Sequence, residues 1–146
     1  MLDENFYQQD ITIENNMVVF KTTLLNKPLT ELRIIDFLEK TKIMVNSFYE
    51  PKIKKICLIY NIEHVTIPDN FQFIKDFCNI YTNNRQILIK KLQFTIIQSN
   101  NTIFNLFFNM FKKYYTPIKP LYFSKSDDET KICINDNESV KELDFS

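Results

Sequence analysis

The chain has 146 residues, of which 45% are hydrophobic, and its 18 Lys and Arg residues are balanced by 18 Asp and Glu residues. This length and apolar content predict one domain with a core of its own and exclude a disordered chain. A net charge of zero argues against broad electrostatic attraction to nucleic acid, which we do not expect as a partner.

Glycine is absent from the sequence, although average usage would give about ten glycines in a chain of this length. Without glycine the chain has no P-loop, no dinucleotide-binding fingerprint and no nucleophile elbow, which excludes several large classes of enzyme. Tight turns then need another residue that accepts a positive φ, and Asn is the usual one.

The cysteine pattern and the N-terminal sequence both favour a cytoplasmic protein. Cys57, Cys78 and Cys133 are odd in number and lack a CxxC spacing, so we expect reduced, buried thiols. The first ten residues are acidic and polar, unlike a secretory signal, and no stretch approaches the about 20 apolar residues of a membrane span. We therefore expect no transmembrane segment.

The first elements in chain order are a hairpin and a helix. Residues 11–13 and 17–22 are short apolar or β-branched runs separated by Glu14-Asn15-Asn16, which predicts a β-hairpin. Apolar residues then recur at spacings of three and four over residues 29–49, which predicts a helix with Thr30 as its N-cap.

Strands and helices alternate in the rest of the chain. Asp69, with Gln72 three residues later, has the pattern of a capping box and predicts that a helix begins there. The remaining predicted elements are a buried strand at 55–62, the helix from Asp69 to 83–84, a strand at 92–98, a helix at 103–115, a strand at 121–123, and a helical turn or edge strand at 132–134.

The predicted order is therefore β-β-α-β-α-β-α-β, an α/β fold. Alternating strands and helices favour a mostly parallel sheet, here of four to five strands, with helices packed on it and right-handed crossovers. We expect a single domain over residues 1–134, followed by an acidic, polar tail over residues 135–146.

His64 is the only histidine and follows the predicted strand at 55–62. A residue in this position is placed to ligate a metal or to form a nucleophilic pair with Cys57, but no set of three or four ligands has a familiar spacing. We therefore interpret His64 as an ordinary loop histidine, with metal binding and catalysis as the alternatives. We expect no metal, no cofactor and no enzymatic activity.

The predicted helix at 103–115 is apolar over an unusually wide arc. Phe104, Phe108 and Tyr115 lie beside a core-facing stripe that is already complete. Either this helix makes a wide contact with the sheet, or it exposes an aromatic patch to a protein, a lipid or an identical subunit.

The order of elements and residues 58–71, with the sequence LIYNIEHVTIPDNF, resemble a STAS domain, the family of sulfate transporters and anti-sigma-factor antagonists. Residues 92–115 and 121–123 resemble later parts of that family, so the resemblance covers residues 11–134. It implies a STAS-like fold and a module that binds partner proteins. Asn70 stands where bacterial members carry a phosphorylatable serine, and Phe71 replaces the glycine after it, so phosphorylation-driven switching is not expected. The lipid-binding CRAL-TRIO domains have a related topology.

Our first hypothesis is a non-enzymatic protein–protein interaction module or assembly subunit, bound to a protein partner or to copies of itself. The expected contact residues are in the loop after the strand at 55–62 and on the Phe-rich helix: Glu63, His64, Asp69, Asn70, Phe71, Phe104, Phe108 and Phe111. The alternative is a small lipid-binding or membrane-peripheral domain in which the Phe-rich helix lines an acyl pocket. An enzyme is the third hypothesis.

Overall fold

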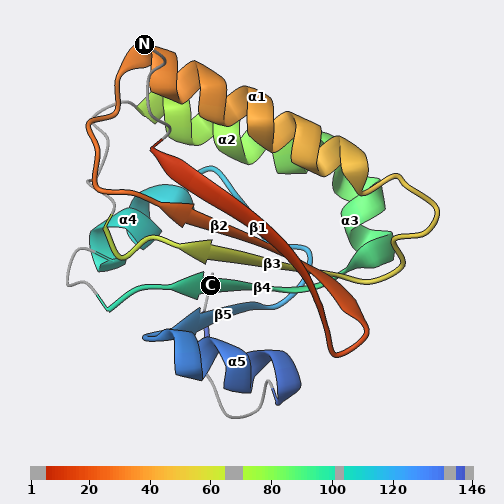
Figure 1. Ribbon diagram of the computed structural model, residues 1–146. Coiled ribbons are helices and arrows are strands. Elements are labelled where there is room, and N and C mark those ends of the chain that lie inside the picture. Colours follow the sequence, from red (N-terminus) through yellow and green to blue (C-terminus); the bar gives the residue numbers. More distant parts are fainter. Residues whose placement is uncertain (1–5, 65–70, 101–103, 137–140, 144–146) are drawn as a thin grey trace.

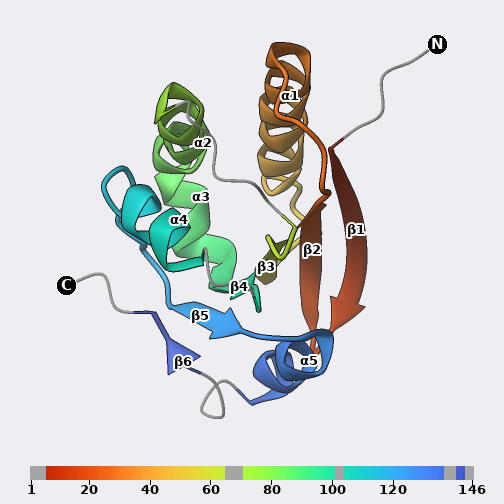
Figure 2. The same cartoon turned by 90° about the vertical axis from the view of Figure 1, so that its left-hand side faces the viewer.

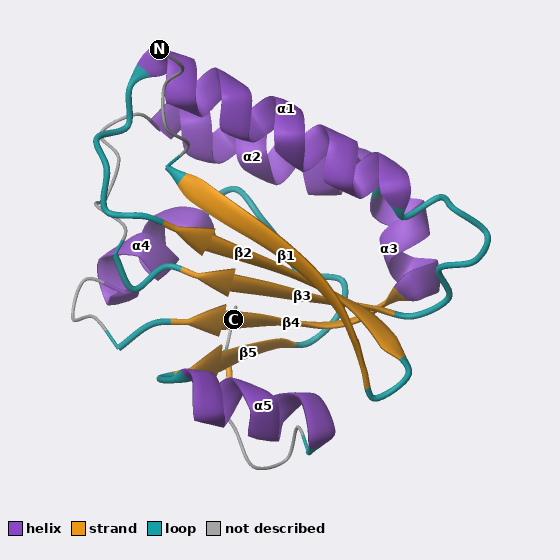
Figure 3. Cartoon of the chain, viewed as in Figure 1, coloured by secondary structure: helices purple, strands orange, loops and turns teal. Residues whose placement is uncertain are grey.

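The computed structural model describes residues 6–64, 71–100, 104–136 and 141–143 of the chain (Figure 1). The described residues form an α/β fold around one sheet of six strands in the order β1-β2-β3-β4-β5-β6 (Figure 3). The inner strands are parallel and the two edge pairs are antiparallel. The predicted mostly parallel sheet is confirmed, although it has six strands instead of four to five.

The chain opens with the predicted hairpin, formed by β1 (Tyr7–Glu14) and β2 (Met17–Leu24). Its turn residues Asn15 and Asn16 have φ values of 50° and 62°. Two consecutive positive φ values define the type I′ turn, whose twist matches that of the flanking strands. Asn therefore takes the place of glycine at this turn, where positive φ is required.

Three parallel strands follow β2 across the sheet: β3 (Ile56–Asn61), β4 (Leu92–Gln98) and β5 (Leu121–Ser124). Every residue of β3 is buried, as expected of a central parallel strand whose two faces are both covered.

The helices α1 (Glu31–Ser47), α2 (Phe71–Asn83) and α4 (Phe104–Phe111) connect these strands. Thr30 caps α1 as predicted, because its hydroxyl oxygen accepts a hydrogen bond from the N–H of Arg33 at 3.3 Å.

Two elements, α3 and β6, were not predicted, and the helical turn predicted at 132–134 is part of a longer helix, α5. A short helix α3 (Arg85–Lys91) follows α2 and leads directly into β4, where the sequence predicted an end at 83–84. A helix α5 (Asp127–Asn135) contains the apolar cluster at 132–134, and Ser126 caps it by accepting a hydrogen bond from the N–H of Glu129. The segment predicted as a tail adds β6 (Lys141–Glu142), which pairs with β5 and is followed by the buried Leu143.

The sheet separates two apolar cores (Figure 2). The larger core lies between the sheet and the helices α1, α2 and α3, and includes Phe37, Phe48, Leu58 and Leu88. The smaller core lies on the opposite face under α5, and joins Val19, Ile59, Ile96, Cys133 and their neighbours. All three cysteines are buried and free.

No helix within the described ranges is long and apolar enough to cross a membrane.

Candidate functional site

An apolar cavity of about 80 Å³ lies in the larger core, between the sheet and the helices α1, α2 and α4. Figure 1 shows α4 beside the carboxyl ends of the parallel strands. The lining residues are Phe6, Leu24, Leu29, Phe37, Leu58, Tyr60, Ile62, Phe73, Ile74, Phe77, Tyr81, Thr95, Ile97, Phe108, Phe111, Tyr115 and Leu121.

Aromatic side chains of α4 and the turn after it line one side of this cavity. Phe108, Phe111 and Tyr115 are half-buried, and the rings of Phe111 and Tyr115 lie 5.3 Å apart. The ammonium group of the exposed Lys112 lies 5.6 Å from the centre of the Phe108 ring. The wide apolar arc of the Phe-rich helix thus includes residues that line a cavity. The Lys112 ammonium group lies over one of them, Phe108.

Helix α2 supplies the opposite aromatic wall. Phe73, Phe77 and Tyr81 follow one another at a spacing of four residues and therefore share one face of the helix. The Phe77 ring lies 5.7 Å from the Phe37 ring of α1 in a stacked arrangement, and 5.5 Å from the Tyr60 ring in an edge-to-face arrangement. These contacts fix the wall in a defined geometry.

The polar atoms of the cavity wall are uncharged. The hydroxyl groups of Tyr60 and Tyr81 are hydrogen-bonded to each other, and burial raises the pKa of both phenols. Burial also raises the pKa of Tyr115 to about 12. Among the described residues that line the cavity, none carries a charge at neutral pH. The wall therefore suits an apolar group and penalises an ionic one.

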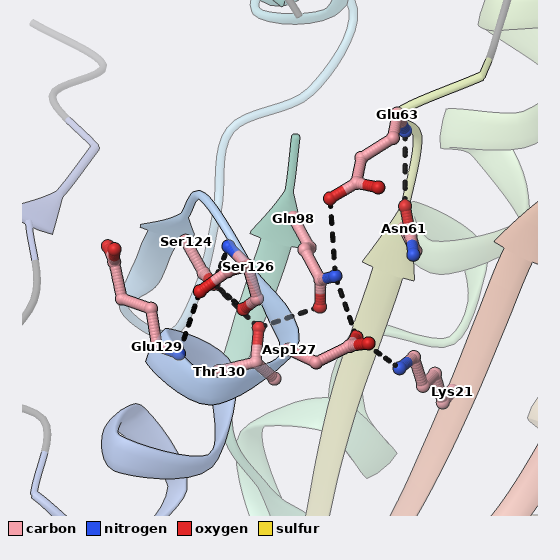
Figure 4. Close-up of polar contacts among 9 residues, drawn as sticks. All are labelled: Lys21, Asn61, Glu63, Gln98, Ser124, Ser126, Asp127, Glu129 and Thr130. Atoms are coloured by element: carbon pink, nitrogen blue, oxygen red, sulfur yellow. Dashed lines mark hydrogen bonds and ion pairs between the residues drawn. The ribbon is translucent and has the colours of Figure 1, made fainter. Parts of the chain in front are cut away.

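A cluster of polar side chains occupies the opposite face of the sheet, also at the strand ends (Figure 4). Asn61, Gln98 and Ser124 lie in one row across β3, β4 and β5. All three are buried. Gln98 accepts a hydrogen bond from the hydroxyl of Thr130 at 2.8 Å, and the Thr130 and Ser124 hydroxyl oxygens lie 2.6 Å apart.

The outer part of this cluster is charged. Asp127 accepts hydrogen bonds from the Gln98 amide at 2.9 Å and from the Lys21 ammonium at 3.2 Å. The hydrogen bond from Gln98 and the adjacent Lys21 lower the pKa of Asp127 below its ordinary value. Glu63 lies at the same site, with its carboxylate oxygen 3.5 Å from the Gln98 amide nitrogen.

This polar cluster joins α5 to the sheet. In the described part of the chain, every buried side-chain nitrogen and oxygen has a hydrogen-bond partner, so the cluster presents no unsatisfied group to a ligand. No group of three or more potential metal ligands occurs among these residues either. Its arrangement is that of a structural network.

The described contact residues that the sequence predicted divide between the turn after β3 and the cavity beneath α4. Glu63 is half-buried in the turn after β3, and His64 beside it is exposed. Asp69 and Asn70 lie outside the described residues. Phe71 begins α2, but its side chain lies outside the described part of the structure.

Of the contact residues predicted on the Phe-rich helix, Phe108 and Phe111 line the cavity. Phe104 begins α4, and its side chain is not among those that the structure describes. The loop and the Phe-rich helix were proposed as two outward surfaces. Ile62 at the end of β3 and Phe73 in α2 also line the cavity, whereas Glu63 and His64 are not among its lining residues.

Sequence reasoning predicted the helix that forms α2 but did not identify a cavity beneath it. The available signal was the aromatic content of the chain, 14 Phe and 7 Tyr. No protein-family model matches the sequence, and no characterised protein or solved structure shows significant similarity to it.

Proposed function

We propose that this protein is a non-enzymatic binding domain that takes the apolar chain of a lipid-like ligand into the cavity beneath α4. This is the function that the sequence analysis placed second. The observation that carries it is the cavity itself, which is uncharged and lined by aromatic and aliphatic side chains from the sheet and three helices. Sites for small apolar ligands have this character.

The size of the cavity indicates how the ligand enters. Its volume of about 80 Å³ is smaller than the about 150 Å³ of an engineered cavity that accommodates benzene. The closed form therefore holds the end of a chain, and a longer acyl chain requires α4 to move outward. Phe108 and Phe111 would then remain in contact with the ligand.

The charge beside α4 indicates the head group. Lys112 and Lys113 are exposed at the end of the helix, and the Lys112 ammonium group lies above the ring of the cavity-lining Phe108. An anionic head group in this position would remain in solvent and meet a cation, while its chain is buried. A single-chain carboxylic acid has this chemistry.

Dodecanoate is a suitable probe, measured by isothermal titration calorimetry and by native mass spectrometry. We expect Leu58→Phe to fill the cavity from β3 and abolish binding without lowering the melting temperature. Leu32→Phe is the matched control, because Leu32 is 73% exposed on α1. Absence of binding to the unmodified protein, or unchanged binding by the Leu58 variant, would overturn the proposal.

The contribution of Lys112 is tested separately by comparing dodecanoate with dodecanol. Lys112→Gln should weaken binding of the acid and leave binding of the alcohol unchanged. An equal effect on both ligands would mean that Lys112 acts by packing on Phe108 and not by its charge.

The proposed relation to STAS domains concerns the fold. It is supported by an opening antiparallel hairpin that is followed by parallel strands in sequential order. An interaction module remains a second candidate function, and the observation in its favour is a pair of isoleucines on the open edge strand. Ile11 and Ile13 are 66% and 78% exposed on β1.

A further inference from the structure

Among the residues that the structure describes, β1 forms one edge of the sheet and pairs on one side, with β2. An unpaired strand edge offers a row of backbone donors and acceptors to another strand. Natural edges are commonly protected by charged side chains, proline or a bulge. β1 has the sequence YQQDITIE, whose charged residues are Asp10 and Glu14; it has no lysine or proline, and it pairs with β2 in unbroken register.

The hairpin fixes which backbone groups point outward. The two-residue turn makes Glu14 and Met17 the closing pair, and in an antiparallel ladder every second pair exchanges hydrogen bonds. The hydrogen bond from the Leu25 N–H to the Phe6 carbonyl belongs to the same alternating series, because Phe6, like Glu14, has an even residue number. The even-numbered residues of β1 therefore bond to β2, and the backbone groups of Gln9, Ile11 and Ile13 point away from the sheet.

The same residues carry the exposed apolar side chains. Ile11 lies opposite Phe20 and Ile13 lies opposite Val18, so both isoleucines project from the face of the sheet that carries the larger core. They nevertheless remain largely exposed. One strand thus combines outward-pointing hydrogen-bonding groups with exposed apolar side chains, and both would be covered by a strand added at this edge.

We propose that β1 pairs antiparallel with β1 of a second copy of this chain, about a two-fold axis at Ile11. The two sheets would then form one continuous sheet of twelve strands. Antiparallel pairing of identical strands is self-complementary, as a closed two-fold dimer requires. This inference is independent of ligand binding in the cavity.

Charge selects this register among the alternatives. A two-fold axis at Thr12 would place Asp10 opposite Glu14 of the second copy, and an axis at Asp10 would place the two Asp10 side chains together. Like charges in directly opposite positions destabilise a strand pair. An axis at Ile11 places Asp10 opposite Thr12 and Gln8 opposite Glu14 of the second copy, which avoids both repulsions. A two-fold axis nearer either end of β1 would pair fewer of its residues with the second copy.

The contact is limited in size. One strand edge and two isoleucines per copy bury less than the about 800 Å² per partner of a standard interface, so we expect a dimer with a micromolar dissociation constant. Sedimentation equilibrium from micromolar to near-millimolar concentration should show reversible dimerisation. Ile11→Pro should abolish it, because proline removes an outward-pointing N–H and leaves the pairing with β2 intact.

Disulfide cross-linking tests the register directly. Ile11→Cys places two thiols in opposite positions about 5.5 Å apart at Cα, which permits a disulfide. Ile13→Cys is the matched control, because the two substituted residues would be about 13 Å apart along the strands. The three native cysteines are buried and should not compete. Mild oxidation should therefore yield a covalent dimer from the Ile11 variant alone.

Charge variants at Gln8 give an independent measurement. Gln8 is exposed and is expected opposite Glu14 of the second copy. Gln8→Lys should strengthen the dimer about two- to fivefold, and Gln8→Glu should weaken it by a similar factor. A monomer at every concentration, or cross-linking of a Thr12→Cys or Ile13→Cys variant in preference to the Ile11 variant, would overturn the proposal.

Discussion

The ammonium group of Lys91 donates a hydrogen bond to the carbonyl oxygen of Phe48, 43 residues earlier in the chain, at a distance of 2.5 Å. It donates a second hydrogen bond to the carbonyl of Glu50 at 2.9 Å. Lys91 is the last residue of α3 and is 6% exposed, while Phe48 is the C-cap of α1. A buried cation therefore satisfies the carbonyl groups at and just beyond the end of a helix, where the helix dipole favours positive charge.

Replacing this lysine should destabilise the fold. Lys91→Met keeps much of the apolar stem but leaves the carbonyl groups of Phe48 and Glu50 without their donor, so we expect the free energy of unfolding to fall by about 1–3 kcal/mol. The neighbouring Lys90 is exposed, and Lys90→Met is the matched control. Urea denaturation of both variants measures the difference. Equal stabilities would show that solvent replaces Lys91 at the helix end.

The pairing of Asp127 with Gln98 and Lys21 should make stability fall in acid. Because the pKa of Asp127 is lower in the folded protein than in the unfolded chain, its contribution is present above its ordinary pKa of about 3.9 and is lost as the pH falls through the folded value. Asp127→Asn retains an oxygen acceptor for Gln98 but removes the charge that faces Lys21. The variant should be slightly less stable than the parent at pH 7, and the two should converge in acid.

The measurement is urea denaturation over an acid pH series, with Asp128→Asn as the control for loss of one carboxylate. Asp127 is largely exposed, so solvent screening keeps the effect small. A constant difference between parent and Asp127 variant at every pH would mean that the charge makes no contribution through this pair.

Local sequence signals predicted most elements of this fold because their causes are local. Asn15 and Asn16 predicted the hairpin through their tolerance of positive φ, and Thr30 predicted the start of α1 through its side-chain oxygen. The strand at 92–98 was predicted with the bounds that β4 has. The elements missed depend on distant contacts: α3 is anchored by Lys91 on the end of α1, and β6 exists only by pairing with β5.

The candidate site was less accessible from sequence. The Phe-rich helix was correctly singled out, but its spacing does not say whether an aromatic residue projects into a core, a cavity or solvent. That depends on the volume left between α1, α2 and the sheet after Phe37, Phe73 and Phe77 have packed. The cavity of about 80 Å³ results from how all the lining side chains pack together, and no single residue in the sequence indicates it.

The buried tyrosines should make the protein unfold in alkali. Burial raises the pKa of Tyr115 to about 12, so its neutral form stabilises the folded state fully below about pH 10 and this contribution is lost as the pH rises towards 12. Tyr115→Phe should reduce the loss of stability over that interval. Spectrophotometric titration of the parent and of the Tyr115→Phe variant, followed together with circular dichroism, provides the measurement. Ionisation of Tyr115 without loss of structure would contradict its burial beside the cavity.

Phe108 distinguishes an inward-facing α4 from an exposed contact surface. Phe108→Asp replaces an aromatic ring of the uncharged cavity wall by a carboxylate. We expect loss of dodecanoate binding together with a lower free energy of unfolding, because the apolar packing of the ring is lost and a carboxylate is costly to place in an apolar wall. Asn109→Asp is the matched control, since it adds the same charge at the adjacent, exposed position of α4. Urea denaturation and calorimetry of the two variants give both readouts. If Phe108 instead served an outward protein contact, Phe108→Asp would keep full stability and dodecanoate binding and would lose only association with the partner.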